Sequence, residues 1–114
     1  MNNVKPITIT NKETGDVYTL EFTRESVKFA EMRGFNINNL DKFPMTTVPE
    51  LFFYAFRAHH KNVARDKTDK ILFEDLGGMP KGMIERLGEL YAAPFESLTN
   101  EEDTVKNAKV TVEF

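Results

Sequence analysis

The chain of 114 residues contains no cysteine. This absence excludes disulfides and thiolate metal sites, so the fold must be held by packing, and a reducing cytoplasm is the simplest compartment. The sequence also lacks any run of about 20 apolar residues that could span a bilayer. Its polar start, Met1-Asn2-Asn3 followed by Lys5 and Pro6, lacks the apolar core of a signal peptide. We therefore expect a cytoplasmic protein without a membrane partner.

A basic surface stripe is missing as well. The net charge is -3, and residues 1–57 carry seven basic and seven acidic side chains. Residues 58–83 carry five and four, and residues 84–114 carry three and seven, so acid collects at the C-terminal end. Nucleic-acid binding depends on clustered Lys and Arg that neutralise phosphates. The charge distribution therefore argues against a nucleic-acid partner.

The pattern at the N-terminus predicts a β-hairpin in an α+β fold. Residues 4–10 and 17–22 alternate between apolar and polar, and turn formers separate them. Pro6 cannot donate a ladder hydrogen bond, so the first strand should lie at an edge or begin near this residue. Residues 109–114 alternate in the same way and could add a third strand, the alternative being a frayed tail. We expect one domain over 1–98, followed by an acidic linker and this strand or tail over 99–114.

Four helices are expected between these ends, over residues 24–33, 48–60, 65–76 and about 80–93. Thr23 can cap the first helix, and Gly34 suits its end. Thr47-Val48-Pro49-Glu50 has the spacing of a capping box for the second. Gly77-Gly78 should end the third, and Pro94 should kink or end the fourth. If the fourth helix continues past Pro94, one apolar stripe of it comprises Ile84, Leu87, Leu90, Tyr91, Phe95 and Leu98.

The second helix is apolar almost all round, which indicates burial at the centre of the fold or against a partner. Phe52 and Phe56 share one side of it, so we assign both to the core. Phe53 lies toward the polar arc with Arg57 and is assigned to a partner surface, although core packing is the alternative. The first helix also has a wide apolar arc. The predicted protein interface, which should support self-association, comprises Phe53, Arg57, Phe29 and Met32.

No motif predicts catalysis, a metal or a cofactor. His59 and His60 are adjacent and diverge by about 100° on a helix, so we interpret them as capping the C-terminal end of the second helix. The Gly-rich segment 77–82 lacks the spacing of a phosphate-binding loop and is interpreted as a turn. Asp66, Asp69, Glu74 and Asp75 do not follow a calcium-loop pattern and are assigned to a solvated face. We therefore expect a binding protein that is not an enzyme.

Five segments carry a family resemblance: LEFTRESVK (20–28), RGF (33–35), LFFYAFRAHH (51–60), KTDKI (67–71) and LYAAPFESL (90–98). With them the chain resembles a small family of proteins from phages and prophages of Gram-positive bacteria. That family is similar in size and order to the tail assembly chaperones of long-tailed phages. The resemblance covers roughly residues 7–98 and contains no catalytic signature.

This resemblance implies a chaperone that binds the tape measure protein of the phage tail, keeps it soluble and helps to bring tail tube subunits to it. The implied compartment is the cytoplasm of the bacterial host. An apolar helical client would need apolar grooves on its chaperone. The alternative is a structural virion part, such as a tail-completion or head-tail connector protein, whose hairpin would pair edge to edge in a ring. A regulatory binding module is a third hypothesis.

Overall fold

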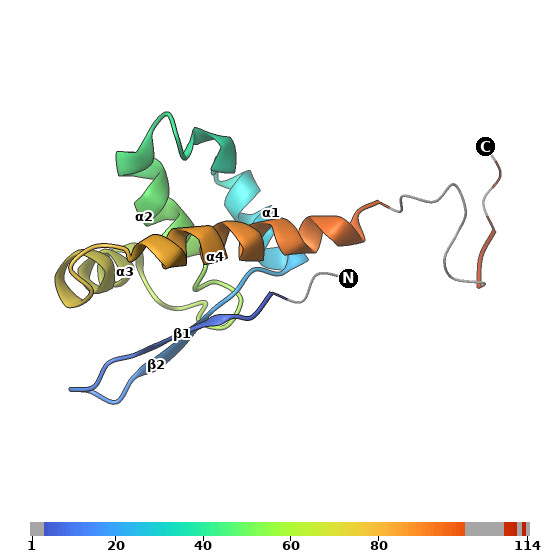
Figure 1. Cartoon of the computed structure of the whole chain (residues 1–114). Helices are drawn as coiled ribbons and strands as arrows, with labels where there is room; N and C mark the ends of the chain where they lie inside the picture. Colours follow the sequence, from blue (N-terminus) through green and yellow to red (C-terminus); the bar gives the residue numbers. More distant parts are fainter. Residues whose placement is uncertain (1–3, 100–108, 112, 114) are drawn as a thin grey trace.

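A computed structural model describes residues 4–99, 109–111 and 113. An antiparallel hairpin is followed by four helices, which confirms the predicted α+β fold. In the view of Figure 1 the hairpin lies below α4, α2 lies above it and α1 crosses behind it. The elements are β1 (Ile7–Thr10), β2 (Val17–Leu20), α1 (Arg24–Met32), the 3₁₀ turn η1 (Ile37–Asn39), α2 (Pro44–Tyr54), α3 (Arg65–Lys70), the π turn η2 (Ile71–Asp75), α4 (Lys81–Ala92) and the 3₁₀ turn η3 (Ala93–Ser97).

The hairpin is organised by its turn. Ile7 pairs with Leu20 and Ile9 with Tyr18. The Asn11 side-chain oxygen accepts backbone N–H groups of the turn, and Gly15 has a φ of 81°, which suits glycine. Within the described residues the sheet has two strands, and residues 109–111 and 113 form none. Residues 112 and 114 of the predicted third strand lie outside the described part.

The first helix begins and ends as predicted. The Thr23 hydroxyl accepts the Ser26 N–H at 3.1 Å, and the Ser26 hydroxyl accepts the Thr23 N–H at 2.8 Å. This reciprocal pair satisfies two backbone donors at the helix start. After the helix, Gly34 has a φ of 87°, in the left-handed region that glycine adopts without a steric cost.

The predicted limits of the second helix are wrong at both ends. The helix begins at Pro44, because a proline at the first position needs no N–H partner and the Phe43 carbonyl accepts the Thr47 N–H at 2.9 Å. Thr47 is thus a buried residue of the helix, and its hydroxyl donates to the Asn39 carbonyl instead of capping. The helix ends at Tyr54, since the N–H groups of Phe56 and Arg57 bond carbonyls three residues back, and the Ala55 carbonyl accepts the N–H of Glu21, which follows β2.

The last two helices follow the predictions closely. The third runs as α3 into η2 and stops before Gly77 and Gly78, both of which have positive φ. The fourth begins after Pro80 and leaves the α-helical geometry around Pro94, where η3 continues it. Since the helical phase changes there, the expected apolar stripe also stops: Phe95 is 38% and Leu98 is 66% exposed.

The core forms where β2, α1, α2 and α4 meet. Phe52 and Phe56 are 0% and 1% exposed, which confirms their assignment to the core. Their rings lie 5.1 Å apart in an edge-to-face arrangement, which is favourable for aromatic pairs. The other fully buried side chains of greatest volume are Leu20, Leu51, Leu72, Leu87 and Thr68.

Candidate binding surface

Three of the four predicted interface residues lie around one small pocket. Phe29 of α1 and Phe53 and Arg57 from the end of α2 line a hollow of about 150 Å³, which we call the aromatic pocket. The Arg57 guanidinium carbon lies 3.8 Å from the centroid of the Phe29 ring, and that of Arg33 lies 4.6 Å from it. A cation over an aromatic face contributes about 0.5–1 kcal/mol at exposed sites. The two arginines therefore hold the Phe29 ring in place at the pocket wall.

Tyr54 supports the aromatic pocket from the core side. Its ring lies 5.1 Å from that of Phe53 and 6.1 Å from that of Phe29. Burial raises the pKa of the Tyr54 phenol above its ordinary value of 10.0, and the negative charge of Glu50 raises this pKa further. Tyr54 is therefore neutral at physiological pH. Phe53 itself is half-buried, so one part of its ring packs on Tyr54 and another remains open to a partner.

Met32, the fourth predicted interface residue, lies on α1 outside the aromatic pocket. Its side chain is 78% exposed. Successive residues of an α-helix are separated by about 100°, which places Met32 between Lys28 and Phe29 around the helix axis. Met32 therefore lies beside the aromatic pocket, on the same exposed side of α1.

A second hollow lies on the other flank of Met32. This α1–η3 groove has a volume of about 270 Å³ and an apolar wall made by Val27, Pro94, Phe95 and Leu98. Arg24, Lys28 and Glu31 of α1 form its charged rim. The sequence prediction placed Phe95 and Leu98 on the core stripe of a continued helix. The exposure of these two side chains could have been predicted from Pro94, because the change of helical phase at this residue turns the following apolar side chains outward.

The two histidines do not cap the second helix, contrary to the prediction, because that helix ends at Tyr54. Instead they bind the strand segment 19–21. The Thr19 N–H donates to His60 Nε2 at 2.9 Å, so this nitrogen acts as an acceptor. His59 Nε2 lies 2.7 Å from Glu21 Oε1. Over residues 4–99, 109–111 and 113, no group of three or more His, Asp or Glu side chains could hold a metal ion.

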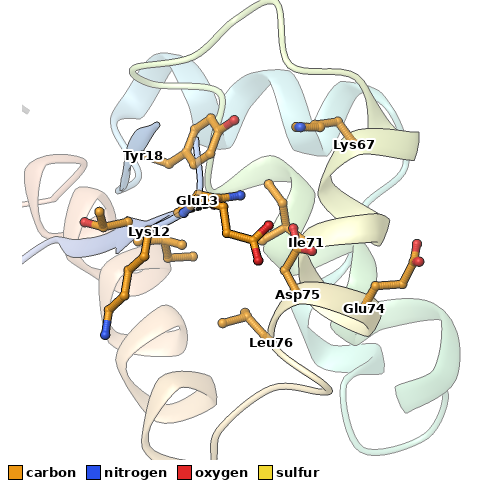
Figure 2. A pocket seen from close by; sticks show the side chains of 11 residues that line it. Lys12, Glu13, Tyr18, Lys67, Ile71, Glu74, Asp75 and Leu76 are labelled. Carbon is orange, nitrogen blue, oxygen red and sulfur yellow. Dashed lines mark hydrogen bonds between the residues drawn. The ribbon is translucent and has the colours of Figure 1, made fainter. Parts of the chain in front are cut away.

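A third hollow, of about 380 Å³, separates the hairpin turn from α3 and η2 (Figure 2). Figure 2 shows the Glu13 side chain directed from the turn toward η2, which carries Asp75. Asp75 is paired with Lys70, whose Nζ lies 3.5 Å from its Oδ1. Glu74 and Asp75 are exposed, which agrees with their assignment to a solvated face. We assign no ligand to this hollow, because its charges are of both signs and solvated.

None of the helices in the described part is long and apolar enough to cross a membrane. The chain matches no curated protein and no solved structure. One family matches it over residues 1–114 and is described as a domain of unknown function, DUF5055. Since the match covers the whole sequence, the chain belongs to the DUF5055 family.

Proposed function

We propose that this protein is an assembly chaperone that binds an apolar helical segment of another protein. The observation that carries the proposal is a surface along α1 on which, in the described parts of the chain, exposed and half-buried apolar side chains lie beside basic ones. This α1 surface comprises the aromatic pocket, the α1–η3 groove and Met32 between them. From the sequence resemblance, we propose the phage tape measure protein as the client and the tail tube protein as a second partner.

The shape and chemistry of the α1 surface support a helical client. A helix binds through apolar side chains spaced by one turn, and it needs a groove with an apolar floor and a charged rim. The α1–η3 groove has this composition, since Phe95 and Leu98 provide the floor and Arg24, Lys28 and Glu31 the rim. The aromatic pocket could accept one further apolar side chain beside Met32, which is a flexible side chain that adapts to different partners.

The exposure of these side chains also supports a binding role. Met32 is 78% exposed and Leu98 is 66% exposed, and Phe29 and Phe53 are half-buried. Apolar patches on a protein surface commonly mark interaction sites. A chaperone would keep such a patch accessible until its client arrives, so the patch is expected in the free protein.

The geometry of the hairpin favours the chaperone over a ring-forming connector. A ring requires two different edges that fit each other from subunit to subunit. The outer edge of β2 is already bonded, because the Thr19 N–H donates to His60 and the Glu21 N–H donates to Ala55. Head-to-tail pairing of hairpins therefore lacks one of its two edges.

Co-expression with the tape measure protein encoded in the same phage or prophage genome tests the proposal. The wild-type protein should increase the soluble fraction of the client and co-purify with it. Met32→Glu should reduce both effects, because it places a charge in the middle of the α1 surface. Met45→Glu is the matched control, since Met45 is 90% exposed and lines neither hollow. Equal recovery of the client with both variants and the wild type would contradict the proposed surface, and no recovery with any of them would contradict the proposed client.

A further inference from the structure

The two edges of the hairpin differ in their hydrogen bonding. On β2, the outward Thr19 N–H donates to His60 Nε2 at 2.9 Å, and the Glu21 N–H donates to the Ala55 carbonyl at 3.0 Å. A histidine ring and a helix-end carbonyl therefore occupy the positions that a neighbouring strand would take. A neighbouring strand is therefore blocked at Thr19 and Glu21, and on β2 the described part of the chain leaves only the outward groups of Val17 and the Thr19 carbonyl without a partner.

The outer edge of β1 is open. The Asn11 N–H donates to the Asp16 carbonyl at 2.8 Å, so the hydrogen-bonded pairs that follow are Ile9 with Tyr18 and Ile7 with Leu20. Thr8 and Thr10 then direct their backbone N–H and C=O groups away from β2. In the part of the chain that the structure describes, these groups have no hydrogen-bond partner, and both threonines are exposed.

From this asymmetry we infer that two copies of the protein pair through their β1 edges. An open edge accepts a strand of another chain through its backbone groups. Since only one of the two hairpin edges is open, edge pairing between copies joins β1 to β1 and closes after two subunits. The occupant of the β1 edge is thus a second copy of this chain, and the product is a dimer with a four-stranded antiparallel sheet.

The backbone pattern and Pro6 define the register. Residues with outward backbone groups must face each other, and the two strands overlap most when the twofold axis passes through Thr8 or Ile9. An axis at Thr8 places Thr10 opposite Pro6 of the second copy, where the missing N–H leaves the Thr10 carbonyl unpaired. An axis at Ile9 pairs Thr8 with Thr10 in both directions and uses all of their N–H and C=O groups. We therefore assign the axis to Ile9.

Charge complementarity supports the same register. With the axis at Ile9, Lys5 of each copy lies toward the turn that carries Glu13 of the other. The Arg86 guanidinium donates to the Lys5 carbonyl at 3.1 Å, which adds a second positive charge at this end. Lys5 and Glu13 are both exposed, and neither has an ion-pair partner within the described residues. The turn also carries Lys12 and Asp16, so its net charge of -1 is opposite in sign to the charge of the end that carries Lys5 and Arg86.

Cysteine variants test this register cleanly, because the natural chain has no cysteine. Ile9 would face Ile9 of the second copy as a non-hydrogen-bonded pair, with Cα atoms about 4.5 Å apart, which lies within the range for a disulfide. Under mild oxidation, Ile9→Cys should form about tenfold more disulfide-linked dimer than Val17→Cys, an exposed control position on β2. More crosslinking through Thr8→Cys than through Ile9→Cys would overturn the register.

A charge exchange gives a second, noncovalent test. Lys5→Glu and Glu13→Lys should each raise the dissociation constant of the dimer about fivefold or more in sedimentation experiments at low salt, and the double variant should restore it. Circular dichroism checks that each variant is folded. A wild-type protein that remains a monomer at high concentration, or a double variant no better than the singles, would overturn the inference. Client binding does not enter these measurements, so their outcome is independent of the proposed function.

Discussion

Replacing His60 tests the role that the structure gives to this residue at the β2 edge. His60→Ala removes the acceptor of the part-buried Thr19 N–H. A buried donor without a partner costs about 1–3 kcal/mol. The variant also loses the ring contacts of His60 with Tyr18 at 5.3 Å and with Phe56 at 6.3 Å, and such aromatic pairs contribute about 0.5–1.5 kcal/mol. We expect a total loss of about 2–4 kcal/mol in the free energy of unfolding.

The neighbouring His59 provides a matched control. Its contact with Glu21 is between side chains that are 43% and 33% exposed, so solvent screens it. His59→Ala should therefore cost less than about 1 kcal/mol. His60→Gln should recover part of the loss, because the glutamine side-chain oxygen can also accept an N–H.

Urea denaturation monitored by circular dichroism measures all three variants on one scale. His60→Ala should also associate into larger species, since it opens the β2 edge of a protein that already pairs through its β1 edge. Our reasoning would be refuted if His59→Ala destabilised the protein as much as His60→Ala.

Three further predictions concern the core, a helix cap and the tyrosines. Phe52→Ala should lower the free energy of unfolding by about 3–5 kcal/mol, because the side chain is fully buried, whereas Phe53→Ala should lower it by no more than about 1 kcal/mol. If denaturant melts gave the reverse order, the assignment of Phe52 to the core and Phe53 to the surface would be wrong. Thr23→Ala removes the capping box of α1 and should cost about 1 kcal/mol in the same assay, while an unchanged stability would show that the cap is dispensable. Burial raises the pKa of Tyr54 and Tyr91 above 10.0, so both ionise more easily in the unfolded chain. Their contribution to stability should therefore be present below pH 10 and fall as the pH rises above it. Denaturant melts at a series of alkaline pH values would measure this fall, and a stability that does not change with pH would contradict it.

Local signals were sufficient where short segments determine the structure. The hairpin followed from alternation and its turn, and the start of α1 followed from Thr23. The glycines at 34, 77 and 78 ended helices as expected, because their positive φ values suit few other residues. In each case the residues that interact lie within a few positions of one another.

Contacts between distant segments explain what the sequence did not predict. The Ala55 carbonyl just after α2 accepts the N–H of Glu21, which lies 34 positions away. The role of His60 depends on Thr19, 41 positions away. Helical phase assigned Phe29, Phe53 and Arg57 to an interface, but it could not show that the guanidinium of Arg57 covers the Phe29 ring. These features depend on tertiary packing between distant segments, which cannot be predicted from the pattern of a single sequence.

Site-specific photo-crosslinking tests the central claim, binding of an apolar helical client at the α1 surface, most directly. A photoreactive amino acid would replace Met32 in one variant and Met45 in another, since both side chains are largely exposed. Both variants would be irradiated after co-expression with the tape measure protein of the same genome. The account predicts a covalent adduct with the client from position 32 and none from position 45. Adducts from position 45 alone, or equal yields from both positions, would contradict it.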